Sequence, residues 1–145
     1  MNRFQKIFIK KIYSLKGLFT NDSNIVFAYL FGGLLKDKPN PLSDVDVAVY
    51  VKNTKKLNYL ELFSNIANVL GTDEIDLVIL NTAPLSLTRR ILQNRKVLID
   101  KNPFQRHRYE SIILREFFDF TIKERDILKR RYGTGRLRKI QKGNS

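Results

Sequence analysis

The stretch of sequence that indicates the fold most clearly is residues 25–51, IVFAYLFGGLLKDKPNPLSDVDVAVYV. The first seven residues, 25–31, are continuously apolar and rich in β-forming types, which predicts a short strand buried on both faces. That strand ends at Gly32-Gly33, and residues 34–43 form a polar connection that contains prolines. From Asp44 to Val51 polar or small residues alternate with valines, which is the period-two pattern of a second strand.

Further elements are predicted on both sides of this pair. Apolar residues at helical spacing indicate helices over 3–19, 56–70 and 82–94, the second closed by Gly71 and the third with Pro84 in its first turn. Strands are predicted at 75–80 and 97–99, and Asn102-Pro103 opens a long helix to about Tyr132. The order α-β-β-α-β-α-β-α predicts the α/β (α+β) class, with a mixed sheet covered by helices on at least one face and a long C-terminal helix.

Composition and charge narrow the class of protein. The 145 residues fit one domain, which we place at 1–132, followed by a basic, disordered tail at 133–145. The chain has no cysteine, and no stretch approaches the roughly 18 apolar residues of a membrane span, so we expect a cytoplasmic protein without a membrane contact. The net charge of +13 favours anionic partners such as nucleotides, nucleic acid or an acidic protein, although basic composition alone also produces such a charge.

Three aspartates on predicted strands indicate the chemistry. Asp44 and Asp46 lie two residues apart on one strand, so their side chains leave the same face with Cα atoms about 7 Å apart. Asp76 lies inside the apolar run 75–80, where a charged residue is rare without a partner. If the two strands are neighbours, the three carboxylates form one cluster that suits Mg²⁺ and could hold the two metals of a nucleotidyl transfer. Asp76 would then be placed to accept the proton of the attacking hydroxyl.

The bend before the acidic strand suits phosphate binding. Gly32 and Gly33 allow a backbone to approach phosphates closely and direct N–H groups at them. Lys36 and Lys38 in the following loop would add positive charge near the β- and γ-phosphates. Taken singly, a Gly-Gly pair is usually a turn and an Asp-x-Asp triplet is often a strand end or a cap. The order of these features along one chain makes the functional interpretation stronger than either feature alone.

At these residues the chain resembles the minimal nucleotidyltransferase (MNT) family of the polymerase-β superfamily. That family carries Gly-Ser, ten residues and then Asp-x-Asp, and here Gly32-Gly33 is followed by ten residues and Asp44-Val45-Asp46. Ser43 matches the serine common before the first aspartate, and Asp76 matches the third acidic strand. The resemblance implies a nucleotidyltransferase-like sheet, ATP as substrate and a two-metal Mg²⁺ site on Asp44, Asp46 and Asp76. Together with the glycine bend and the loop lysine, the motif predicts that Gly32, Gly33, Lys36 and Ser43 bind the nucleotide.

One position departs from that family. Its serine after the first glycine is Gly33 here, which removes a hydroxyl donor but keeps the backbone N–H. Many stand-alone members resemble the antitoxin of a toxin–antitoxin pair whose partner is a helical HEPN-domain ribonuclease. The resemblance therefore implies that the chain transfers AMP from ATP to a tyrosine of such a toxin and also binds it.

Other residues have simpler expected roles. His107, the only histidine, is expected to be solvated on a helix. Phe117, Phe118 and Phe120 are expected mainly in the core, with part of them free to dock a partner helix. The basic cluster that begins at Lys129-Arg130-Arg131 lacks the interleaved aromatic residues of single-strand binders, so direct nucleic-acid binding is the less favoured interpretation. One of Arg89 and Arg90 could reach a phosphate.

Three functions remain open from the sequence. The first is protein adenylylation of a HEPN toxin, which the three intact aspartates favour. The second is a catalytically weak or dead homologue that neutralises its partner by docking, which Gly33 favours. The third is a nucleotidyltransferase acting on RNA or on a small molecule such as an aminoglycoside, against which the lack of a further substrate domain argues.

Overall fold

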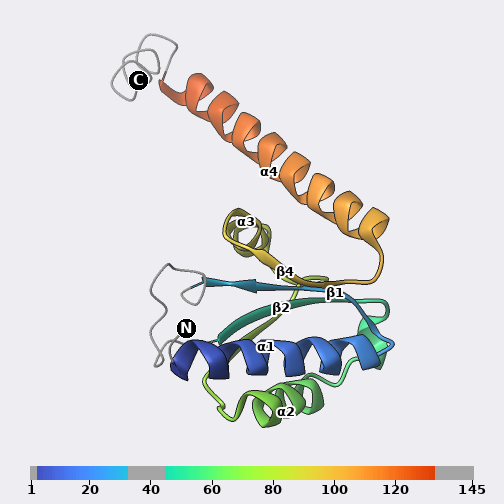
Figure 1. Cartoon of the computed structure of the whole chain (residues 1–145). Coiled ribbons are helices and arrows are strands. Elements are labelled where there is room, and N and C mark those ends of the chain that lie inside the picture. Colours follow the sequence, from blue (N-terminus) through green and yellow to red (C-terminus); the bar gives the residue numbers. More distant parts are fainter. Residues whose placement is uncertain (1–2, 33–44, 133–145) are drawn as a thin grey trace.

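The computed structural model describes residues 3–32 and 45–132, and the predicted tail at 133–145 lies outside this range. Figure 1 shows the elements in the order α1 (Arg3–Asn21), β1 (Ile25–Phe31), β2 (Val45–Val51), the 3₁₀ turn η2 (Thr54–Lys56), α2 (Tyr59–Leu70), β3 (Ile75–Ile79), α3 (Leu85–Gln93), β4 (Lys96–Asp100) and α4 (Pro103–Tyr132). The predicted order of helices and strands is confirmed.

The four strands form one mixed sheet in the order β3-β2-β1-β4. β1 is antiparallel to both of its neighbours, β2 and β4, whereas β2 and β3 are parallel. The parallel pair needs a crossover, which α2 supplies between the two strands. β1, the continuously apolar strand of the sequence, lies inside the sheet and is buried along almost its whole length.

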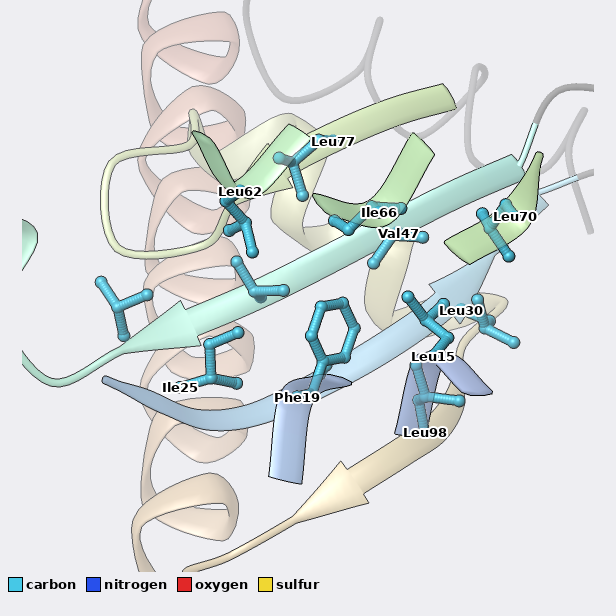
Figure 2. Close-up of a cluster of buried hydrophobic side chains, with 13 residues drawn as sticks. Leu15, Phe19, Ile25, Leu30, Val47, Leu62, Ile66, Leu70, Leu77 and Leu98 are labelled. Carbon is cyan, nitrogen blue, oxygen red and sulfur yellow. The ribbon is translucent and has the colours of Figure 1, made fainter. Parts of the chain in front are cut away.

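Helices cover both faces of the sheet, where the sequence predicted at least one. Leu15 and Phe19 of α1 and Leu62, Ile66 and Leu70 of α2 pack on one face, against the valines of β2 (Figure 2). On the other face α3 and α4 cover a second cluster, which contains Phe27, Tyr29, Ala48, Val78 and Ile91. The alternation of β2 therefore sorts its valines to the α1/α2 face and Ala48 to the α3/α4 face.

Two helix starts differ from the prediction, and local capping accounts for one of them. α2 begins at Tyr59, not near Lys56, because the side chain of Asn58 accepts a hydrogen bond from the Glu61 N–H and Leu57 is extended. Pro84 is the N-cap of α3 and lies just outside the helix. At other ends the predicted caps are present: Gly71 closes α2 with a φ of 69°, and Asn102 accepts from the Gln105 N–H at the start of α4.

α4 is one continuous helix of 30 residues that runs over α3 and continues past it (Figure 1). Two of its phenylalanines lie in different environments, whereas the side chain of Phe120 is outside the described part of the chain. Phe117 is half-buried with the guanidinium of Arg89 over its ring, whereas Phe118 is 68% exposed, so the expectation of a core position is wrong for Phe118. Leu114, Phe118 and Ile122 form an exposed apolar line at i, i+4 and i+8, which we name the α4 stripe. Among the described helices, none is both long and apolar enough to cross a membrane.

Candidate functional site

Two of the predicted aspartates meet on adjacent strands. Asp46 of β2 pairs in register with Asp76 of β3 in the parallel ladder. Residues in register on neighbouring strands project to the same face, with backbones about 4.8 Å apart. Asp46 shares its strand face with Ala48, and Asp76 shares its face with Val78, which both pack in the α3/α4 cluster. The structure therefore brings Asp46 and Asp76 together on the α3/α4 face of the sheet.

The two carboxylates are reachable from solvent. Asp76 is exposed and Asp46 is partly exposed, although both strands continue into the buried sheet. Within the described residues no side chain forms a hydrogen bond or an ion pair with Asp76. Like charges directly opposite each other on neighbouring strands destabilise a sheet.

Gly32 places the end of β1 directly against this pair. Its φ is +79°, a left-handed conformation that side-chain-bearing residues seldom adopt. A Cβ at this position would overlap Oδ2 of Asp46 and lie only 2.8 Å from its Cγ. Since glycine has no Cβ, the Asp46 carboxylate can lie close to the backbone at the Gly32 bend. The bend and the acidic pair therefore form one site.

Four other predicted site residues fall outside the described part of the chain. These are Gly33, Lys36, Ser43 and Asp44. Their proposed roles rest on the sequence alone. Among the residues that the structure does describe, no group of three acidic, histidine or cysteine side chains is arranged to hold a metal ion.

Another carboxylate on the same face, that of Glu110, is surrounded by donors. Glu110 of α4, 8% exposed, accepts a hydrogen bond from the Tyr29 hydroxyl at 2.8 Å. Arg95 and Arg106 each form an ion pair with Glu110 at 2.8 Å. Arg106 also contacts Asp100 at 2.7 Å, which connects α4 to β4. We name Glu110, its partners Tyr29, Arg95 and Arg106, and Asp100, which Arg106 also binds, the Glu110 cluster.

The protonation equilibria of this cluster follow from its contacts. Burial alone would raise the pKa of Glu110, but hydrogen bonds from Tyr29, Arg106 and Arg95 together lower it below its usual value. Burial and the bond to Glu110 raise the pKa of Tyr29, which therefore stays a neutral donor. The hydrogen bond to Asp100 raises the pKa of Arg106. The cluster is thus a charged connection between α4 and the sheet, in which Oδ1 of Asp100 is buried without a hydrogen-bond partner among the described residues.

Sequence reasoning did not find the Glu110 cluster. Its members are residues 29, 95, 100, 106 and 110, which come from β1, β4, α4 and the connection between α3 and β4. The only local signal is the i, i+4 spacing of Arg106 and Glu110, which is common on helix surfaces.

An aromatic stack supports the strand that carries Asp46. The rings of Phe27 and Tyr50 are stacked at 4.8 Å with an interplanar angle of 4°, and Tyr109 of α4 lies against both rings. Burial raises the pKa of Tyr109, whose hydroxyl contacts the Leu80 carbonyl at 3.4 Å. These contacts fix β2 against α4 on the face that presents Asp46.

The sheet order, the helix-covered faces and the paired strand aspartates define a nucleotidyltransferase fold. The family model for "Polymerase beta, Nucleotidyltransferase" matches residues 13–104, which is more than half of the chain. The chain belongs to this nucleotidyltransferase family. No curated protein matches it.

Solved structures of similar fold share about a fifth of their sequence with this chain. A crystal structure of a toxin–antitoxin with AMP-PNP superimposes with a TM-score of 0.67 at 22% identity, covering 81% of this chain and 95% of that chain. A structure of a tri-AMPylated Shewanella oneidensis HEPN toxin in complex with MNT antitoxin gives a TM-score of 0.62 at 22% identity, covering 85% and 96%. At this identity the likeness shows the fold.

Proposed function

We propose that this chain is a Mg²⁺-dependent protein adenylyltransferase and the antitoxin of a toxin–antitoxin pair, transferring AMP from ATP to a tyrosine of a HEPN ribonuclease toxin. The observation that carries the proposal is the register pairing of Asp46 with Asp76 beside the Gly32 bend. Membership of the nucleotidyltransferase family supports the reaction type. The nucleotide analogue and the AMPylated HEPN toxin in structures of similar fold support the substrate and the partner.

The donor set at the acidic pair fits magnesium. Carboxylate oxygens are the ligands that Mg²⁺ takes from proteins, and it commonly keeps one or two of them together with substrate phosphates. Asp46 and Asp76 offer two carboxylates on one solvent-reachable face, and the motif spacing adds Asp44. When bound there, the metal would neutralise charge on the triphosphate and lower the pKa of the attacking hydroxyl.

The transfer is a displacement at the α-phosphorus of ATP, and this chain supplies the acceptor for the proton that is released. The tyrosine oxygen of the partner attacks the α-phosphorus of ATP and forms the new P–O bond. The bond between the α-phosphorus and the oxygen that bridges to the β-phosphorus breaks, and pyrophosphate leaves. The phenolic proton passes to a carboxylate, for which Asp76 is placed because it is exposed and lies next to Asp46.

Transfer is tested with ATP labelled at the α-phosphate, Mg²⁺ and the purified HEPN partner. The wild-type chain is expected to move label to the partner, and Asp44→Asn is expected to abolish the transfer. Asp73→Asn is the matched control, since Asp73 is an exposed aspartate before β3 and is not part of the motif. Wild-type protein that leaves the partner unlabelled would refute the enzymatic proposal, and label on RNA instead would identify another acceptor.

A second candidate function is neutralisation by docking alone, and the α4 stripe favours it. Leu114, Phe118 and Ile122 are 52%, 68% and 52% exposed, a contiguous apolar line of the kind that helical partners cover. Under this alternative the wild-type chain and Asp44→Asn inhibit the ribonuclease equally without any label on it. Phe118→Ser would then release the inhibition of the ribonuclease. If the chain acts by transfer instead, a toxin that already carries the label stays inactive after the chain is removed.

A further inference from the structure

Beside the acidic pair the protein surface has a small open depression. It has a volume of about 80 Å³ and lies between the end of β1 and α3. The residues that line it are Phe31, Gly32, Leu87, Arg90, Ile91 and Asn94. Pockets for whole small-molecule ligands usually measure about 300–1,000 Å³. The depression is therefore large enough for only a fragment of a ligand, such as a phosphate group. Because Gly32 also borders Asp46, such a fragment would lie next to the carboxylates.

One face of α3 forms the wall of this depression. Leu87, Arg90, Ile91 and Asn94 recur at i, i+3, i+4 and i+7, which places them on a single helix face. Arg89 points elsewhere, since its guanidinium lies 3.9 Å from the centre of the Phe117 ring. The structure thus resolves which of the two adjacent arginines of α3 borders the Gly32 bend.

Arg90 differs from the other arginines packed near this face. Arg95 and Arg106 are bound to Glu110, and Arg89 is covered by an aromatic ring. Arg90 is exposed, and within the described residues it has no hydrogen bond and no ion pair. A guanidinium presents several N–H donors in a plane and suits phosphate oxygens. Asn94 adds an amide on the same helix face.

We propose that Arg90 binds the β- and γ-phosphates of ATP in the depression beside Gly32. This inference rests on the proposed function and assigns a triphosphate-binding residue that the sequence motif does not contain. Arg90 would supply donors near the bend at which position 33 has no hydroxyl. By holding the β- and γ-phosphates, it would orient the leaving pyrophosphate away from the attacking oxygen and stabilise the charge that develops there.

A purely structural role for Arg90 makes a different prediction. Arg90 lies in the last turn of α3, where a cation interacts favourably with the helix dipole. In that case its removal lowers thermal stability and leaves nucleotide affinity unchanged, or weakens ATP and AMP equally. Contact with the terminal phosphates instead predicts a selective loss of ATP affinity.

The test compares the binding of Mg²⁺-ATP and of AMP by calorimetry in the wild-type chain, Arg90→Gln, Arg90→Lys and the charge-matched control Arg108→Gln. Arg90→Gln is expected to weaken ATP binding by about 10- to 100-fold, the range expected for a hydrogen bond to a charged group, and AMP binding by less than about twofold. Arg90→Lys should recover part of the ATP affinity, and Arg108→Gln should match the wild type. In transfer assays KM for ATP should rise more than kcat falls.

Unchanged ATP affinity in Arg90→Gln, with normal binding by the wild type, would overturn this inference and leave the proposed function intact. An equal loss of ATP and AMP affinity with a lowered Tm would also overturn it in favour of the helix-dipole role. If the wild-type chain itself binds no ATP, the proposed function fails and the inference fails with it.

Discussion

The Glu110 cluster and the Asp46–Asp76 pair are two carboxylate regions on the same side of one sheet, and they differ in what surrounds the charge. Glu110 is 8% exposed and receives a tyrosine hydroxyl and two guanidinium groups. Asp46 and Asp76 face each other as like charges on paired strands, and Asp76 is open to solvent. The first arrangement is compensated by donors of the same chain, whereas the second presents two carboxylates on one solvent-reachable face.

This difference separates stability from function. A buried carboxylate whose donors are all supplied by the fold holds elements together, so its loss should affect unfolding. A pair of like charges at the end of a sheet costs stability in the absence of a ligand, and such local costs are typical of functional sites. Substitution of Glu110 should therefore lower stability, whereas substitution in the acidic pair should lower the rate of transfer without a loss of stability.

The largest expected effect is on transfer when the acidic pair is broken. Asp76→Asn is expected to lower the rate of AMP transfer by about 10²- to 10⁴-fold, because the variant loses a proton acceptor and a metal ligand together. Its Tm should stay within about 2 °C of the wild type, a small change for one exposed side chain. Initial-rate assays with labelled ATP measure the effect. A variant that retains the full rate would contradict the role given to Asp76.

The next largest effect is on stability when the Glu110 cluster is broken. Glu110→Gln is expected to lower the free energy of unfolding by about 3 kcal/mol at neutral pH, at the lower end for a buried ion pair because Arg95 is 28% exposed. Since the folded pKa of Glu110 is lowered, its contribution is present above the unfolded pKa of about 4.3 and is lost as pH falls through the folded pKa. Urea unfolding across pH measures this difference.

The stability gap between wild type and Glu110→Gln should therefore narrow below about pH 4. Glu116→Gln, on an exposed turn of the same helix, is the control and should change stability by less than about 0.5 kcal/mol. A gap that is constant from pH 3 to 7 would show that the charge of Glu110 contributes nothing.

A smaller effect is expected where the bend meets the acidic pair. Gly32→Ala introduces a Cβ that overlaps the Asp46 carboxylate and strains a backbone with φ +79°, so we expect a loss of about 1–2 kcal/mol in stability. Because Asp46 must shift, transfer should fall as well. Gly17→Ala is the matched control, since a Cβ there meets no atom within 4 Å and lies inside α1. Equal behaviour of the two variants would argue against a close Gly32–Asp46 contact.

The smallest effect is a gain in stability. Asp76→Asn removes the like-charge repulsion with Asp46 and is expected to stabilise the metal-free chain by about 0.2–1 kcal/mol. Thermal unfolding in the presence of a chelator measures the gain, and it should disappear when salt screens the two charges. A destabilised Asp76→Asn variant would mean that the carboxylate of Asp76 has a structural role comparable to that of Glu110.

Regular patterns account for the part of the molecule that the sequence predicted. The continuous apolar run of β1 and the alternation of β2 depend on burial and strand geometry, which are local properties of the chain. The facing of Asp46 and Asp76 follows once β2 and β3 are neighbours, because the ladder register decides which side chains share a face. The start of α2 was displaced by the capping amide of Asn58, a competition that apolar spacing does not report.

Contacts between distant residues account for what the sequence could not predict. The Glu110 cluster assembles residues from β1, β4, α4 and the segment after α3, so no local pattern marks it. The separation of Arg89 from Arg90 depends on the direction in which α3 packs against α4. The exposure of Phe118 depends on how far α4 runs beyond the residues that cover it. Each of these outcomes is decided by tertiary packing.

The most direct test of the acidic pair as a cation site is to measure the binding of Mn²⁺, a spectroscopic substitute for Mg²⁺. Electron paramagnetic resonance monitors this binding in the wild-type chain, Asp76→Asn and Glu110→Gln. The wild type and Glu110→Gln are predicted to bind Mn²⁺ with similar affinity, and Asp76→Asn at least about 10-fold more weakly. Equal Mn²⁺ affinity in the wild type and Asp76→Asn would contradict the claim that the two paired strands supply the ligands of one metal.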